Sequence, residues 1–199
     1  MRTFAAVVAA VAATSSPTVV RPVSPVDANG TLKPAYEIKH HYSGARCQSG
    51  SAMTGTAYRC FTARAPQGVF DPCWVTETSD HVICLSVPWR KKNAVELHVT
   101  DGYDDTDGFQ PASRPWGLRV DLPRRCLLHP VAVENAQGHA IHYYCNKHTA
   151  LAGPIDRSGS RWRVRAYRNT TPHAVQPTYK WIGWAHVVTA WRGEPSRTD

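Results

Sequence analysis

The sequence has no apolar run long enough to cross a membrane as a helix. A transmembrane helix needs about 20 apolar residues, and the apolar stretch from Phe4 to Ala13 is far shorter. No later segment shows the sustained i, i+3, i+4, i+7 apolar spacing of an amphipathic helix, and Pro interrupts most long windows. These absences argue against a helical membrane protein and against a helical bundle.

Short motifs of the common enzyme classes are also missing. The chain contains no His-Glu-x-x-His, Gly-x-Ser-x-Gly, Walker-type Gly-Lys-Ser/Thr or Gly-x-Gly-x-x-Gly motif. It has no Cys-x-x-Cys pair, which argues against a structural zinc site. Four carboxylates lie within residues 101–108, but EF-hand spacing would place Tyr103 and Arg114 at ligand positions. We therefore predict an acidic loop without metal, no cofactor and no recognisable enzyme class.

The residues that are present favour strands. Seven Trp and eight Tyr accompany many β-branched residues, in short runs separated by Gly, Pro, Asp and Asn. The sequence therefore predicts a single, mostly β domain: a disulfide-stapled sandwich or barrel of about eight short antiparallel strands. The expected strands are Ala57–Ala63, Val69–Val75, His81–Val87, Ala94–Thr100, Trp116–Leu122, His139–Cys145, Arg161–Arg168 and Ala185–Trp191.

Six cysteines form an even set in this small chain, which is typical of a disulfide framework in an exported protein. Six cysteines allow 15 pairings. The spacing favours pairing between neighbours, each closing a loop of about 12 to 20 residues and contributing about 3 kcal/mol in the chain-entropy model. The expected pairs are Cys47 with Cys60, Cys73 with Cys84, and Cys126 with Cys145.

The N-terminus also indicates export. Arg2 precedes the apolar stretch, which ends in the small-residue pattern Ala10-Val11-Ala12. We interpret residues 1–13 as a signal peptide; the alternative is an Ala-rich N-terminus without that function. Residues 14–35 are rich in Pro, Ser and Thr and read as a leader or linker. The β domain is expected over residues 36–191, with a polar tail over 192–199, and the protein is expected to be secreted.

The net charge indicates the class of partner. Lys and Arg exceed Asp and Glu by 23 to 15, which gives a formal charge of +8. A positive field attracts nucleic acid, an acidic cell-wall polymer or a membrane surface alike. The charge alone therefore predicts attraction to polyanions without choosing among them.

One segment offers a candidate anion-binding face. Strand alternation would place Arg161, Arg163 and Arg165 together on the face opposite Trp162. Guanidinium groups about 6 to 7 Å apart could hold successive anionic groups bidentately. The alternative is a solvated face paired with carboxylates of a neighbouring strand.

Two further features are candidates for binding. Trp181 and Trp184 lie in a less regular segment and could form an exposed stacking platform for a sugar or a base, although core packing is the simpler interpretation. The basic runs 90–92 and 124–125 are interpreted as turn residues.

The positions of the histidines do not identify a general acid and a general base for catalysis. His139 and His142 would point to opposite faces of a strand. His142 and Asp156 are the pair to examine if the protein is a hydrolase.

Several segments resemble a known group of proteins: residues 47–51, 57–61, 71–74, 82–85, 88–89, 116–118, 156–157 and 162–165, with Tyr-Arg-Cys and Asp-Pro-Cys as the most specific motifs. They are similar to uncharacterised exported Cys-rich proteins of actinobacteria, and to extracellular modules attached to some receptor-type Ser/Thr kinases. The resemblance covers about residues 36–191. It implies an exported module and assigns no activity or catalytic residue.

Together these features predict a secreted, envelope-associated module that binds an anionic cell-surface polymer or glycan. Two alternatives stay open. One is a secreted hydrolase, a nuclease or a cell-wall-degrading enzyme, that uses His with Asp or Lys. The other is a protein-binding inhibitor or sensor domain.

Overall fold

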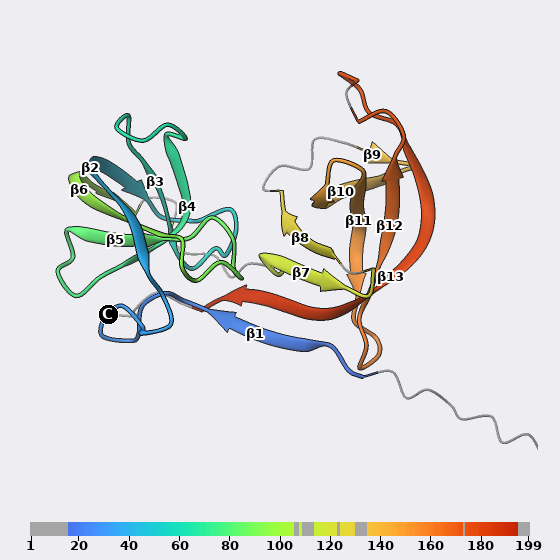
Figure 1. Ribbon diagram of the computed structural model, residues 1–199, viewed down its shortest axis with the longest axis horizontal. Coiled ribbons are helices and arrows are strands. Elements are labelled where there is room, and N and C mark those ends of the chain that lie inside the picture. The colour runs from blue at the N-terminus through green and yellow to red at the C-terminus, as the bar shows by residue number, and fades with distance from the viewer. Residues whose placement is uncertain are drawn as a thin grey trace, which may run out of the picture.

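The computed structural model describes residues 16–105, 108, 114–122, 124–129, 135–172 and 174–194. The expected signal peptide lies outside these residues. Over the described part of the chain the protein has thirteen strands and no helix. None of its described segments is a helix that could cross a membrane. The strands form two barrels that lie side by side (Figure 1).

The first barrel is a closed ring of five strands: β2 (Ile38–Gln48), β3 (Tyr58–Phe61), β4 (Val69–Val75), β5 (His81–Cys84) and β6 (Ala94–Asp104). Consecutive strands are antiparallel, and the parallel pairing of β2 with β6 closes the ring. Its interior holds Phe70, Val82, Leu97 and both disulfides of this barrel.

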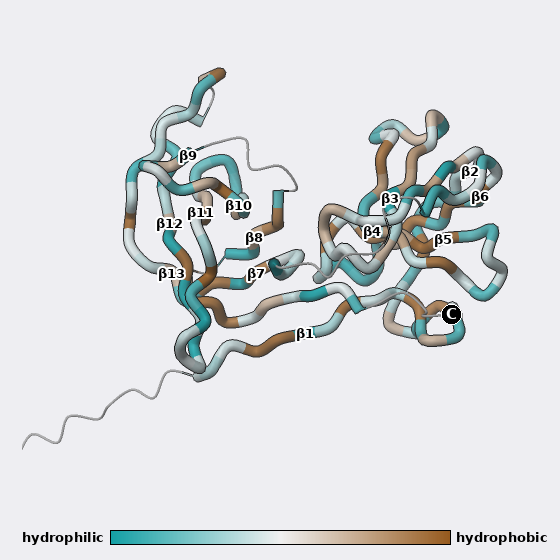
Figure 2. Tube along the Cα trace, turned by 180° about the vertical axis from the view of Figure 1, so that it is seen from behind, coloured by the Kyte–Doolittle hydropathy of each residue, from teal (hydrophilic) through white to brown (hydrophobic). Residues whose placement is uncertain are grey.

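The second barrel contains six antiparallel strands: β7 (Gly117–Val120), β8 (Arg124–Leu128), β10 (His139–Asn146), β11 (Thr149–Asp156), β12 (Arg163–Asn169) and β13 (Tyr179–Gly193). Pairing of β13 with β7 closes it. The short strand β9 (Asn135–Ala136) pairs with β10. Hydrophobic and hydrophilic segments alternate along the strands (Figure 2), as expected where one face of each strand is buried.

A shared hydrophobic cluster joins the two barrels. Trp74 of the first barrel packs near Trp116, which precedes the second, with ring centroids 6.2 Å apart. Strand β1 (Val19–Val23) runs parallel to the end of β13, and its Val23 is buried in the same cluster. Part of the segment expected to be a leader therefore forms a strand and belongs to the interface between the barrels.

The C-terminal end of β13 is also fixed. Residues 192–193, expected to lie in a polar tail, belong to β13, and Glu194 forms an ion pair with Lys33 at 2.8 Å. Residues 195–199 lie outside the described part of the chain.

All three expected disulfides are confirmed: Cys47–Cys60, Cys73–Cys84 and Cys126–Cys145. Each joins two neighbouring strands, which explains why close sequence spacing identified the pairs. The sulfur atoms of Cys60, Cys73 and Cys84 lie within 4.8 Å of one another. They are disulfide sulfurs, not the thiolates that bind metal. Three disulfides are consistent with an extracellular protein.

The mostly β class is confirmed, but a single unit of about eight strands is wrong. The expectation omitted β2, β8 and β11, which complete the two rings. Strand β11 contains Gly153 and Pro154, which normally weaken strand assignments. Most residues of β2 before Ala45 are exposed or partly exposed polar residues, so its apolar pattern is weak. Separation into two closed rings depends on long-range pairing, which strand periodicity does not encode.

Candidate functional site

The predicted arginine face lies on the outside of the second barrel, and two of its three arginines have acidic partners. Arg161 lies 3.3 Å from Asp121, and Arg163 lies 2.8 Å from Asp156. Hydrogen bonds from Ser158, followed by that from Arg163, lower the pKa of Asp156 to about 2. The carboxylate therefore stays charged over the usual pH range and offsets the charge of Arg163.

Arg165 differs from these two arginines. It pairs in register with Trp184 across β12 and β13, and its guanidinium carbon lies 4.8 Å from the Trp184 ring. Arg163 lies at the same distance from that ring. Among the described residues, no carboxylate is within ion-pair distance of Arg165.

Both predicted platform residues are exposed. The exposed fraction is 38% for Trp184 and 50% for Trp181. The structure therefore brings Trp184, but not Trp181, into cation–π contact with the arginine face in the part of the chain that is described.

A second basic surface forms where the two barrels meet, around Trp89, which contacts Trp191 and Arg125 of the second barrel. Trp89 lies in the loop between β5 and β6 and packs 5.1 Å from the ring of Trp191 on β13. A Cβ atom at Gly117 of β7 would lie only 2.8 Å from Trp89 and 2.9 Å from Pro88. Glycine at this position is therefore what lets the loop of the first barrel approach the strand of the second.

This contact joins two basic runs that are distant in the sequence. The guanidinium carbon of Arg125 on β8 lies 5.6 Å from the centroid of the Trp89 ring. Arg125 pairs directly with Arg119 across β7 and β8. Arg90 follows Trp89 and Arg124 precedes Arg125 in the sequence, so the segments that meet at this contact carry six exposed basic residues. We call them the junction cluster: Arg90, Lys91, Lys92, Arg119, Arg124 and Arg125.

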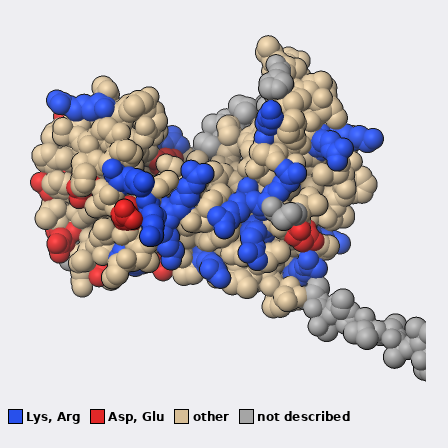
Figure 3. All heavy atoms as spheres, in the orientation of Figure 1, with Lys and Arg blue, Asp and Glu red and all other residues tan. Residues whose placement is uncertain are grey.

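The junction cluster is not neutralised by acidic side chains of the described residues. None of its six members forms an ion pair there. Glu37 lies beside the loop, with its backbone N–H donating to the carbonyl of Lys91, but its carboxylate forms no ion pair among those residues. Figure 3 shows Lys and Arg side chains gathered across the middle of one face, over both barrels.

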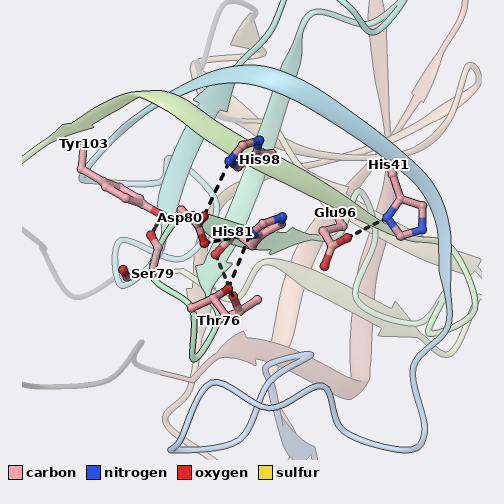
Figure 4. A network of polar contacts seen from close by, with 9 residues as sticks. His41, Thr76, Ser79, Asp80, His81, Glu96, His98 and Tyr103 are labelled. Atoms are coloured by element: carbon pink, nitrogen blue, oxygen red, sulfur yellow. Dashed lines mark hydrogen bonds and ion pairs between the residues drawn. The ribbon is translucent and has the colours of Figure 1, made fainter.

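Histidine and carboxylate side chains meet on the outside of the first barrel (Figure 4). Asp80 lies 2.8 Å from His81 and 3.6 Å from His98, and the two imidazole rings stack with centroids 4.8 Å apart. The hydrogen bond with His81 is the main cause that lowers the pKa of Asp80. On the same side, His41 pairs with Glu96 at 2.7 Å. Periodicity within one strand does not reveal this set, because His41, His81 and His98 lie on three different strands.

His142 and Asp156, the candidate pair for a hydrolase, do not pair with each other in the described part of the chain. No hydrogen bond or ion pair within the described residues joins His142 to Asp156, whose carboxylate contacts Ser158 and Arg163. Burial, with a smaller effect from Arg114, lowers the pKa of His142.

The expected acidic loop is largely strand. Asp101 and Asp104 belong to β6, and Asp107 lies outside the described residues.

Comparisons of this chain with protein-family models, with curated proteins and with solved structures find no match.

Proposed function

We propose that this protein is an exported binding module that holds an anionic cell-surface polymer against the junction cluster. The supporting observation is the contact of Arg125 with Trp89, which unites basic side chains from two barrels into one surface. Export is supported by the three disulfides, which persist in oxidising compartments.

Charge favours the junction cluster over the arginine face predicted from sequence. The junction cluster carries six positive charges and no ion-paired carboxylate among the described residues. At the arginine face, Asp121 and Asp156 offset two of three charges. A polymer that binds the arginine face must compete with these carboxylates for the guanidinium groups. The basic side chains of the junction cluster have no such competitor among the described residues.

The geometry of the junction suits a repeating anion. Arg119 and Arg125 are a direct cross-strand pair, so their Cβ atoms are about 5 Å apart. Like charges at that distance repel one another, and a bound anion between them removes the repulsion. Guanidinium groups also bind phosphate, sulfate and carboxylate bidentately. A chain with closely spaced anionic groups is therefore a better partner than a single small anion.

The proposal is tested by neutralising junction residues that make no ring contact. We compare the wild type with a variant in which Arg90, Lys92, Arg119 and Arg124 are replaced by Gln. The matched control replaces four exposed basic residues elsewhere: Arg46, Lys147, Arg168 and Lys180. Both variants lose the same net charge, so they separate a local site from a general field.

Affinity for heparin and for double-stranded DNA is measured by fluorescence anisotropy between about 50 and 200 mM salt. Each Lys or Arg near an anionic surface contributes about 1 kcal/mol, so the junction variant should bind at least ~100-fold more weakly at the lower salt concentration. The control should lose much less, and its affinity should keep the wild-type dependence on salt. Equal losses in the two variants would contradict a junction site.

A further inference from the structure

A pocket opens at one end of the first barrel, beside the loop that carries the junction cluster. Its volume is about 540 Å³, which is within the range of small-ligand sites. Ser86 and Asn93 of the β5–β6 loop form part of its wall, and residues 90–92 of the junction cluster lie between them in the sequence. The remaining wall comes from β2, from the turn between β3 and β4, and from Val95 of β6.

The lining combines an aromatic surface with unused polar groups. Tyr42 stacks with His40 at a centroid distance of 6.2 Å and packs against Phe70 in the barrel interior. The side chains of Gln67, Ser86 and Asn93 form no hydrogen bond with any described residue. Amide and hydroxyl groups beside a ring are suited to a sugar, which offers several hydroxyls and an apolar face.

The charge of the lining favours an anionic ligand. Lys39 contributes a positive charge and His40 a second one when protonated, while the lining contains no Asp or Glu. The exposed Lys39 gains only neutral hydrogen bonds from a neutral sugar, whereas a carboxylate or sulfate group would bind it as a charge-assisted hydrogen-bond acceptor.

We propose that this pocket binds one acidic sugar unit of an anionic polysaccharide whose neighbouring units lie on the junction cluster. This inference rests on the proposed polyanion-binding function and specifies its ligand as an acidic glycan. The junction cluster supplies attraction that any polyanion shares. The pocket supplies hydrogen bonds that distinguish sugar hydroxyls from a bare phosphate chain.

The test uses a heparin-derived tetrasaccharide, with maltotetraose as a neutral sugar, polyphosphate as a sugar-free polyanion and an oligothymidine strand as nucleic acid. The pocket variant carries Gln67→Ala and Asn93→Ala, two exposed positions where truncation preserves the barrel core. The matched control carries Asn29→Ala and Gln176→Ala, which remove exposed amides away from the pocket lining. Circular dichroism confirms that both variants are folded.

Loss of two hydrogen-bonding groups should weaken tetrasaccharide binding by about tenfold or more in the pocket variant, and should leave polyphosphate binding and the control variant unchanged. In the wild type, amide NMR shifts on adding tetrasaccharide should include residues 39–42, 67, 86 and 93. Shifts confined to junction residues, or equal weakening of polyphosphate binding, would overturn the pocket while leaving the proposed function intact. Preferential binding of oligothymidine in the pocket would also overturn it. Loss of polymer binding in the pocket variant but not in the junction variant would instead refute the proposed function.

Discussion

Arg125 of the second barrel lies over Trp89 of the first, with its guanidinium carbon 5.6 Å from the ring centroid. This contact brings together two basic runs that belong to different barrels. Cation–π contacts at exposed sites contribute about 0.5 to 1 kcal/mol, so the packing around Trp89 supplies most of the stability of the junction. The neighbouring Trp191 and Gly117 provide that packing.

The close approach of Trp89 to Gly117 predicts the effect of one added methyl group. Gly117→Ala places a Cβ where Trp89 and Pro88 already lie, and overpacking of this kind costs about 1 to 3 kcal/mol. The free energy of unfolding, measured with urea, should fall by that amount. Gly159→Ala is the control, because its nearest neighbouring atom would be 4.0 Å from the new Cβ. Equal stability of the two variants would show that Trp89 does not pack tightly on β7.

A partly buried ion pair in the first barrel, with Asp71 as its buried member, predicts a pH-dependent loss of stability. Asp71 accepts hydrogen bonds from Ser51 and Arg59, and the Arg59 pair is 3.0 Å long. Burial nevertheless dominates and raises the pKa of Asp71, because desolvation disfavours the charged carboxylate. Arg59→Gln removes the counter-charge and should lower the free energy of unfolding by about 3 kcal/mol at neutral pH.

The sign of the pH dependence follows from the same burial. Without Arg59 the pKa of Asp71 rises further, so the native variant takes up a proton more readily than the unfolded chain does. The stability difference between wild type and variant should therefore shrink as pH falls, once the buried carboxyl is neutral. Urea unfolding of both proteins at a series of pH values measures this difference in the free energy of unfolding. A difference that is constant from neutral to acidic pH would mean that the effect of Arg59 is packing alone.

Removing the carboxylates of the arginine face should create additional polyanion affinity. Asp121→Asn with Asp156→Asn frees Arg161 and Arg163, so heparin binding at low salt should strengthen by roughly fivefold. Glu77→Gln with Asp101→Asn gives the same net charge at exposed positions elsewhere and should have a smaller effect. Because the pKa of Asp156 is about 2, mild acidification of the wild type does not neutralise this carboxylate, and Arg163 stays paired with it. Equal gains in both variants would indicate that only net charge matters.

The disulfides were predictable because each joins neighbouring strands that are also close in sequence. Most strands were predictable from apolar and aromatic runs. The two rings were not, since the parallel β2–β6 pairing and the β13–β7 closure join segments far apart in the chain.

The binding surface was only partly predictable. Sequence alternation placed Arg163 and Arg165 together, and the structure adds Trp184 beside them. The acidic partners Asp121 and Asp156 lie outside that strand, so the sequence pattern could not show the neutralisation. The runs 90–92 and 124–125 were each interpreted as turn residues, because only the packing of Trp89 against the second barrel brings them together.

Lysine acetylation in the presence and absence of heparin, followed by mass spectrometry, tests the junction cluster most directly. The reactivities of Lys91 and Lys92 should fall several-fold on binding, while those of the exposed Lys147 and Lys180 stay unchanged. Uniform protection of all four lysines, or protection of Lys147 and Lys180 alone, would contradict polymer binding at the place where the two barrels meet.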